Sequence, residues 1–233
     1  MQTEAIVFDF DGLLMDTETT LLECWQYEWR QHGLELDPDT FFADHGGDVT
    51  AEHYRRLAAA VGPGFDYETS HARRLAHREE LHSRLGLCDG IDAWLTQARD
   101  AGLRCAVASS STEEWVTSML ARVDRLDAFA VLAFGDEVRA PKPAPDVYML
   151  ALDRLGLDPA QAIAVEDTPH GAAAAQAAGL SCIAIPNPFA DLTHFTAADL
   201  VLTTGAELSL QDAIEALTGT ASQHSPDSSI HKY

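Results

Sequence analysis

The sequence predicts an α/β fold built on a parallel sheet, with an all-helical part inserted into it. The first observation is a series of short, continuously apolar runs at residues 5–8, 105–108, 130–134, 162–165, 182–185 and 200–202. Strands of this kind that alternate with helical stretches indicate a parallel sheet covered on both faces, as in Rossmann-like folds. The second observation is the segment from about residue 17 to 84, where no strand-like run interrupts the helical spacing.

The predicted helical insertion shows apolar side chains at helical spacing in three places. Two lie around Leu21 and Trp25 and around Tyr54 and Leu57, and a more charged helix follows near residues 71–81. The last residues lack apolar periodicity, so we expect a disordered tail. The predicted parts are a core of residues 1–16 and 85–218, a helical cap of residues 17–84 and a tail of residues 219–233.

Local signals mark the ends of the helices that follow. After the second apolar run, Ser111 and Glu114 have the spacing of a capping box, which predicts that a helix begins there. Gly156 and Gly179 each follow a stretch with helical character and are typical of helix ends.

Composition and charge narrow the classes of function. The formal net charge of −22 means that nucleic acid and anionic membranes would be repelled. No apolar run reaches the length of a transmembrane helix, and the first strand begins within four residues, which leaves no room for a signal peptide. The four cysteines lie far apart without a C-x-x-C motif, so we expect buried thiols and a cytoplasmic protein. We expect a monomer or a weak homodimer.

Polar side chains follow three of the apolar runs at the point where each predicted strand ends. They are Asp9 and Asp11 after the first, Ser109, Ser110 and Ser111 after the second, and Glu166 and Asp167 after the fourth. The carboxyl ends of parallel strands meet at one edge, where open α/β folds bind their ligands. Lys142, in the segment APKPAPD before the fourth of these runs, is expected to join them.

Lys142 is unusual in this composition. Of the 15 basic residues only two are lysines, and the other, Lys232, lies in the tail. A lysine kept between two prolines in an arginine-rich chain indicates that a compact point charge is needed there. An ordinary surface lysine is the alternative.

The acidic cluster predicts a magnesium site. It has no histidine or cysteine nearby, and oxygen ligands suit Mg²⁺. An EF-hand is one alternative, but the glycine of DFDG is fourth rather than sixth in the loop, and Thr20 stands where a bidentate glutamate is required. Two solvated carboxylates are another alternative, which does not explain the hydroxyl and ammonium groups at the other strand ends.

Phosphoryl transfer through a carboxylate is the chemistry that needs these groups. A carboxylate attacks phosphorus only when the phosphate charge is neutralised and the attack is held in line. Mg²⁺ on Asp9 and Asp167, the Ser109 hydroxyl and the Lys142 ammonium would provide that neutralisation. Asp11 would give a proton to the leaving alcohol and later take one from water.

Together these residues resemble the four motifs of the haloacid dehalogenase superfamily of phosphotransferases, in the branch with a helical cap after the first strand. DFDGLLMDTE resembles the first motif, Ser109 the second, Lys142 in PKPAPD the third and VEDTPHG the fourth. The match spans residues 5 to about 190. Within that branch the sequence is most similar to the β-phosphoglucomutase-like group, which includes many phosphatases of small metabolites.

The resemblance implies a role for each matched residue. Asp9 would be the nucleophile that forms an aspartyl-phosphate, and Asp11 the general acid/base, with its backbone carbonyl on Mg²⁺. Ser109 and Lys142 would hold the phosphoryl oxygens. The other assignments are Asp167 as a metal ligand, Glu166 as a metal ligand or a group that orients bound water, and Ser110, Gly12 and Thr17 as phosphate- or substrate-binding residues. His45 and Gly46 would form a substrate loop or, equally, a plain turn.

Departures from the family pattern favour hydrolysis. The sugar-phosphate mutases have a histidine four residues after the threonine that corresponds to Thr17, where this chain has Leu21, and a basic residue in the cap loop, where ADHGGDVT has no arginine. The presence of Asp11 argues against halide displacement. We expect an Mg²⁺-dependent phosphatase of a small phosphorylated metabolite. A phosphosugar mutase and a non-catalytic binder of such metabolites are the alternatives.

Overall fold

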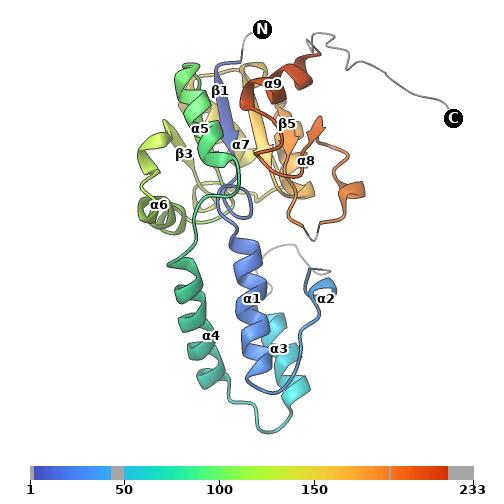
Figure 1. The fold of residues 1–233 in the computed structure, drawn as a ribbon. Coiled ribbons are helices and arrows are strands. Elements are labelled where there is room, and N and C mark those ends of the chain that lie inside the picture. Colours follow the sequence, from blue (N-terminus) through green and yellow to red (C-terminus); the bar gives the residue numbers. More distant parts are fainter. Residues whose placement is uncertain (1–2, 43–49, 189, 220–233) are drawn as a thin grey trace, which may run out of the picture.

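A computed structural model describes residues 3–42, 50–188 and 190–219, and its core is one parallel sheet (Figure 1). In the described residues the strand order is β3-β2-β1-β4-β5-β6, and every pairing is parallel. The strands are β1 Ala5–Phe8, β2 Arg104–Ala108, β3 Val131–Ala133, β4 Ala162–Glu166, β5 Ser181–Ala184 and β6 Leu200–Val201. Each predicted apolar run corresponds to one of these strands, so the predicted α/β class is confirmed.

Strand β1 is continuously apolar because helices cover both of its faces. Ile6 and Phe8 are buried in one hydrophobic cluster, and Ala5 and Val7 in a second cluster on the opposite face. Full burial of a side chain such as Phe8 stabilises the fold by about 2–3 kcal/mol. The helices of the first face are α5 Ile91–Asp100, α6 Glu113–Arg122 and α9 Leu210–Thr218, and those of the second are α7 Asp146–Leu155 and α8 Pro169–Ala177.

The helices between β1 and α5 pack around a hydrophobic cluster of their own. They are α1 Thr17–Arg30, α2 Pro38–Phe42, α3 Thr50–Val61 and α4 Tyr67–His82, and they extend beyond the carboxyl ends of the strands (Figure 1). Trp25 and Tyr54 are buried in this cluster, and the guanidinium of Arg74 lies 4.4 Å from the ring centre of Trp25. No strand interrupts the described parts of residues 17–84. The boundaries of core and cap stay a prediction.

The helix ends agree with the sequence signals at α7 and α8 but not at α6. Gly156 and Gly179 have φ values of +66° and +86°, which glycine adopts without strain. The predicted capping box at Ser111 is wrong. Thr112 is the N-cap of α6, and its side chain accepts a hydrogen bond from the Trp115 backbone N–H. The Ser111 hydroxyl is used elsewhere, because it donates to a carboxylate that follows β1.

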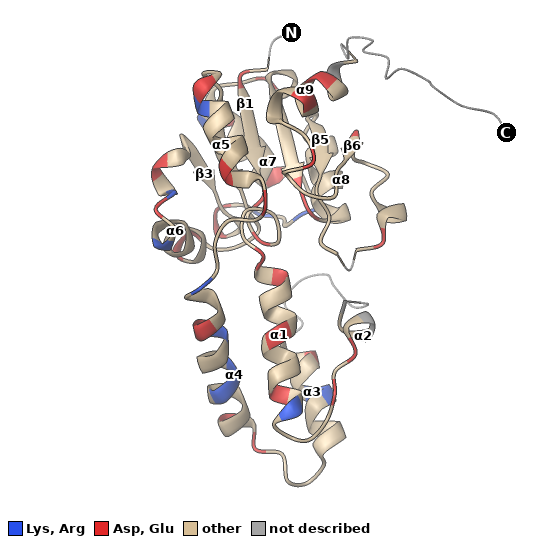
Figure 2. Cartoon of the chain, viewed as in Figure 1, with Lys and Arg blue, Asp and Glu red and all other residues tan. Residues whose placement is uncertain are grey.

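In the described part of the chain, short 3-10 helices occupy four loops, namely η1 Leu126–Ala128, η2 Gly135–Glu137, η3 Pro159–Gln161 and η4 Leu192–His194. All four cysteines are free thiols, and three of them are buried. Acidic side chains lie on most of the α-helices and in the loops, while arginines are most frequent along α4 (Figure 2). Within the described ranges, no helix combines the length and apolar character needed to cross a lipid bilayer. The predicted tail of residues 219–233 lies outside the described residues except for Gly219, which follows α9.

Candidate active site

The segment after β1 places two aspartates at the carboxyl edge of the sheet. Asp9 extends the strand pairing by one hydrogen bond, from its N–H to the carbonyl of Val165 at 2.9 Å. The chain then turns, with Gly12 at φ +82° and its N–H donating to the carbonyl of Met15 at 2.8 Å. Asp9 is buried, at 7% exposure, whereas Asp11 is half-buried.

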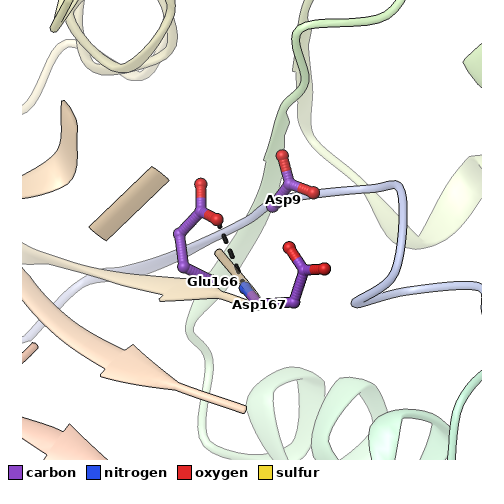
Figure 3. Close-up of side chains that lie close together, drawn as sticks. All are labelled: Asp9, Glu166 and Asp167. Atoms are coloured by element: carbon purple, nitrogen blue, oxygen red, sulfur yellow. Dashed lines mark hydrogen bonds between the residues drawn. The ribbon is translucent and has the colours of Figure 1, made fainter. Parts of the chain in front are cut away.

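The strand order explains why residues far apart in the sequence meet here. The order reverses between β1 and β4, and such a reversal opens a crevice beyond the carboxyl ends of the strands. Asp9 follows β1 on one side of this point, and Glu166 and Asp167 lie at the end of β4 on the other. A carboxylate oxygen from each of the three lies within 4.8 Å of the others (Figure 3).

Burial makes this cluster unfavourable unless positive charge is supplied. It raises the pKa of Asp9 to about 8, although the Lys142 ammonium acts in the opposite direction. Burial, with the charges of Asp9 and Glu166, also raises the pKa of Asp167 well above its usual range. Both carboxylate oxygens of Asp167 are buried without a hydrogen-bond partner among the described residues. Buried carboxylate oxygens without donors fit a hard divalent cation such as Mg²⁺.

Two glycines leave room for the carboxylates at the end of β4. A Cβ atom at Gly12 would overlap Asp167 Oδ2 and lie 3.0 Å from Asp167 Cγ. A Cβ atom at Gly171, near the start of α8, would overlap the carboxyl group of Glu166. Any larger residue at either position would displace a carboxylate of the cluster.

Lys142 connects the two sides of the cluster. Its buried ammonium contacts Asp9 Oδ1 and donates to Glu166 Oε1 at 2.5 Å. Burial disfavours the charged form, but these two carboxylates raise the pKa of Lys142 overall. The Tyr148 hydroxyl of α7 donates to the same Glu166 oxygen at 2.6 Å. The other oxygen of Glu166 accepts the Asp167 N–H at 3.2 Å (Figure 3), so both oxygens of Glu166 have protein donors.

Asp11 lies beside this cluster and is held by neutral donors. Thr17 Oγ1 and Trp115 Nε1 donate to its Oδ1 at 2.9 and 3.0 Å, and Ser111 Oγ donates to its Oδ2 at 2.6 Å. The donors come from the first residue of α1, the loop after β2 and the first turn of α6. Asp11 is therefore oriented by three different elements.

The structure brings most of the predicted site residues together. The residues grouped at the strand ends are Asp9, Asp11, Lys142, Glu166 and Asp167. Ser109 is 1% exposed at the end of β2, and its Oγ accepts the N–H of Ser111 at 3.0 Å. Ser110, by contrast, is exposed. His45 and Gly46 lie outside the described residues.

Three side chains that contact or face the site were not predicted from the sequence, namely Trp115, Tyr148 and Glu18. Ser111 was expected at this edge of the sheet, but its hydrogen bond to Asp11 was not predicted. Trp115 and Tyr148 lie in amphipathic helices and resemble core residues. The signal that could have found them is their polar N–H or O–H group, which needs a partner when it is buried. Burial and the nearby charges of Asp11 and Asp16 raise the pKa of Glu18 to about 7.

The parallel sheet, with a carboxylate–lysine cluster where the strand order reverses, defines the class of protein as a Rossmann-like α/β enzyme. The sequence model of the haloacid dehalogenase-like hydrolase family matches residues 6–185. The chain therefore belongs to the haloacid dehalogenase-like hydrolase family, as the four motifs predict.

Relatives match along most of the chain. Protein CbbY of Rhodobacter capsulatus is 34% identical over 209 residues, which cover 85% of this chain and 92% of the relative. Hexitol phosphatase A of Escherichia coli (strain K12) is 30% identical over 203 residues, or 87% of this chain and 91% of the relative. One similar solved structure is a variant of CbbY from Rhodobacter sphaeroides in complex with xylulose-(1,5)bisphosphate. It is 29% identical to this chain with a TM-score of 0.68, and the match covers 90% of this chain and 98% of that one. The predicted enzyme class, a phosphoric monoester hydrolase, is confirmed.

Proposed function

We propose that this chain is an Mg²⁺-dependent phosphatase of small phosphorylated metabolites in which Asp9 is the nucleophile. The observation that carries the proposal is the position of Asp9 between two buried groups. One is the Lys142 ammonium, which contacts Asp9 Oδ1, and the other is Asp167, which has a carboxylate oxygen within 4.8 Å of one of Asp9 and whose two oxygens have no hydrogen-bond donor among the described residues. A nucleophilic carboxylate needs positive charge on both sides because the phosphate that it attacks is itself an anion.

In this proposal the metal is held by Asp9, Asp167 and the backbone carbonyl of Asp11. Asp167 suits this role because its oxygens accept no hydrogen bond from any described residue, whereas both oxygens of Glu166 accept hydrogen bonds. The role of Glu166 is then to hold Lys142 and to orient water at the metal. When bound, Mg²⁺ supplies positive charge that neutralises the phosphate and stabilises the charge that develops during transfer.

The positions of the side chains support the following steps. Asp9 attacks the phosphorus opposite the leaving oxygen, the bond to that oxygen breaks, and an aspartyl-phosphate forms. Lys142 and Ser109 bind the phosphoryl oxygens. Asp11 gives its proton to the leaving alcohol. It then takes a proton from the water that attacks the aspartyl-phosphate, which releases inorganic phosphate and restores Asp9.

The relatives support a sugar or polyol phosphate as the substrate class. One is named a hexitol phosphatase, and another binds a pentulose bisphosphate in its solved structure. Hydrolysis is favoured over phosphosugar isomerisation because Leu21 takes the place of the mutase histidine. Leu21 packs against the hydrophobic cluster of the inserted helices and offers no hydrogen bond to a sugar. The cytoplasmic location and the oligomeric state stay predictions.

The first prediction concerns the nucleophile. Asp9→Asn should reduce phosphate release by about a thousandfold or more, because an amide does not attack phosphorus. Phosphate release is measured with a panel of several dozen phosphorylated sugars and polyols in the presence of MgCl₂. Asp66→Asn is the matched control, since Asp66 caps α4 far from the cluster and asparagine caps a helix equally well.

Three outcomes would contradict parts of this proposal. Activity retained in Asp9→Asn would exclude Asp9 as the nucleophile. Equal rates with and without a chelator would exclude the metal. Conversion of β-glucose 1-phosphate to glucose 6-phosphate, in place of phosphate release, would identify a mutase.

A further inference from the structure

We propose that Trp115 is a positioning residue, whose indole N–H fixes the orientation of the Asp11 carboxylate while α4 holds the indole through His82. This inference rests on the function proposed above, in which Asp11 carries the proton. It concerns a tryptophan of the core helix α6 that none of the four family motifs includes.

The carboxylate of Asp11 depends on its hydrogen bonds for its orientation. Among the described residues it has no ion-pair partner, and Lys142 contacts Asp9 and Glu166 instead. A carboxylate rotates about its Cβ–Cγ bond in a broad, two-fold potential, so nothing within the side chain itself selects one orientation. The donors at Oδ1 and Oδ2 therefore decide which oxygen faces the phosphate.

The indole N–H differs in chemistry from the two hydroxyl groups that also bind Asp11. A hydroxyl both donates and accepts, so Thr17 and Ser111 can bind a carboxyl oxygen with or without a proton on it. The indole N–H only donates, so it binds an oxygen that carries no proton. Because Trp115 and Thr17 both meet Oδ1, that oxygen stays an acceptor. Oδ2, which lies 2.6 Å from Ser111 Oγ, is then the oxygen that gives and takes the proton.

The indole is held from two directions. On the side of the core, the backbone N–H of Trp115 donates to the side chain of Thr112 at the N-cap of α6, and the indole ring packs against the main hydrophobic core. From the inserted helices, the ring of His82 lies against it, with ring centres 5.0 Å apart and planes inclined by 56°. His82 is only 5% exposed, so this contact is enclosed.

This contact couples the inserted helices to the proton carrier. Thr17 is the first residue of α1, and His82 is the last residue of α4. Both ends of the inserted block therefore reach Asp11, one directly and the other through Trp115. Any shift of α1 and α4 relative to the sheet would change the donors at Oδ1 and so the direction of Oδ2.

Three Trp→Phe variants separate this role from simple packing. Trp115→Phe removes the N–H bound to Asp11. Trp94→Phe removes an N–H that donates to the carbonyl of Leu208 at 3.0 Å within the core. Trp29→Phe removes an N–H without a hydrogen-bond partner among the described residues. Each variant is assayed with phenyl phosphate and p-nitrophenyl phosphate, two esters of similar shape whose leaving groups differ in their need for a proton.

The expected result is a dependence on the leaving group that only Trp115→Phe shows. Its kcat/KM for phenyl phosphate should fall about tenfold or more, because a misplaced acid no longer protonates the poor leaving group. For p-nitrophenyl phosphate, which leaves readily as an anion, the fall should stay within about threefold. Trp94→Phe and Trp29→Phe should keep the wild-type ratio between the two esters, although Trp94→Phe lowers the thermal stability.

Equal losses on both esters in Trp115→Phe, or no loss on either, would overturn the inference while leaving the proposed function intact. A wild-type enzyme that releases phosphate from neither these esters nor the metabolite panel would overturn the proposed function, and the inference would fall with it. A benzothienylalanine side chain installed at position 115 has sulfur in place of the N–H and the same ring shape. If Trp115→Phe does not fold, this replacement decides between the two results.

Discussion

Gly12 shows how little space surrounds the carboxylate cluster. It has two separate requirements, a φ of +82° and the absence of a Cβ atom beside Asp167. Gly33, after α1, shares only the first requirement, because its φ is +71° and a Cβ atom added to it would meet no other atom within 4 Å. Substitutions at these two positions therefore distinguish the effect of backbone strain from the effect of steric overlap with Asp167.

We predict that Gly12→Ala disables the metal site whereas Gly33→Ala does not. Both changes should cost about 1 kcal/mol of stability, since alanine is strained at positive φ. Gly12→Ala should also displace the Asp167 carboxylate and raise the MgCl₂ concentration for half-maximal activity by about tenfold or more. A titration of activity against MgCl₂ checks this prediction. Similar curves for the two variants would show that Asp167 does not bind the metal.

The residues at the strand ends could be predicted because parallel strands in register end together. Phe8 pairs with both Val107 and Val165, so the residues that follow the three strands share one edge. Trp115 and Tyr148 could not be predicted in the same way. The apolar spacing of a helix shows which face is buried, but it does not show which polar group that face meets.

At the scale of single elements, the contact between α4 and α6 carries a titratable group. His82, at the end of α4, packs against Trp115 of α6. Burial, together with the positive charge of Arg78, lowers the pKa of His82 below its ordinary value of 6.5. A buried imidazole of this kind resists protonation in the folded state only, so it links stability to pH.

We predict that the contribution of His82 to the free energy of unfolding becomes unfavourable as the pH falls below about 6.5, the pKa of an unfolded histidine, whereas the raised pKa values of Asp9, Asp167 and Glu18 act in the opposite direction. Above that pH His82 is neutral in both states and contributes nothing. Below it the unfolded chain binds the proton first, which favours unfolding. In urea unfolding, the free energy of unfolding at pH 5.5 relative to that at pH 7.5 should be higher in His82→Phe than in the wild type.

The matched control is His194→Phe, because the His194 side chain is 69% exposed. Between the two pH values this variant should show the same change in the free energy of unfolding as the wild type. If His82→Phe also shows the wild-type change, His82 titrates like a solvated histidine and its contact with Trp115 has no electrostatic consequence.

Sequence signals for helix ends predicted the structure correctly where the residue concerned had no competing hydrogen-bond partner. Gly156 and Gly179 end α7 and α8 because the backbone alone requires them. Ser111 has the right spacing for a cap, yet a carboxylate from a distant part of the chain takes its hydroxyl, and Thr112 caps α6 instead. Local patterns cannot anticipate this competition, since the competing group is a hundred residues away.

At the scale of the whole molecule, the net charge of −22 and the buried carboxylates both favour cation binding. The two effects differ in kind. Surface charges respond to ionic strength in general, whereas the metal site proposed at Asp9 and Asp167 would select a divalent ion. The sequence could predict the charge and the ligand types, but not the burial that makes the site costly without a cation.

We predict that Mg²⁺ stabilises the fold beyond the effect of ionic strength. At a hundred times its Kd, a ligand of the folded state adds about 2.7 kcal/mol, or about 5–10 °C in Tm for a chain of this size. Thermal unfolding in MgCl₂ and in NaCl of equal ionic strength checks this. Asp167→Asn should abolish the difference between the two salts. A difference that persists in this variant would place the Mg²⁺ site elsewhere.

The inserted helices begin and end at almost the same place. The N–H of Cys88, after α4, donates to the carbonyl of Leu14, before α1, at 2.9 Å. A gap this narrow can be closed by a short turn, and the entropy of closing it depends only weakly on the length of the intervening chain. The helical block can therefore be exchanged as a cassette during evolution or by engineering. A replacement needs to keep only a hydroxyl at its first residue and an aromatic ring at its last for Asp11 to retain its orientation.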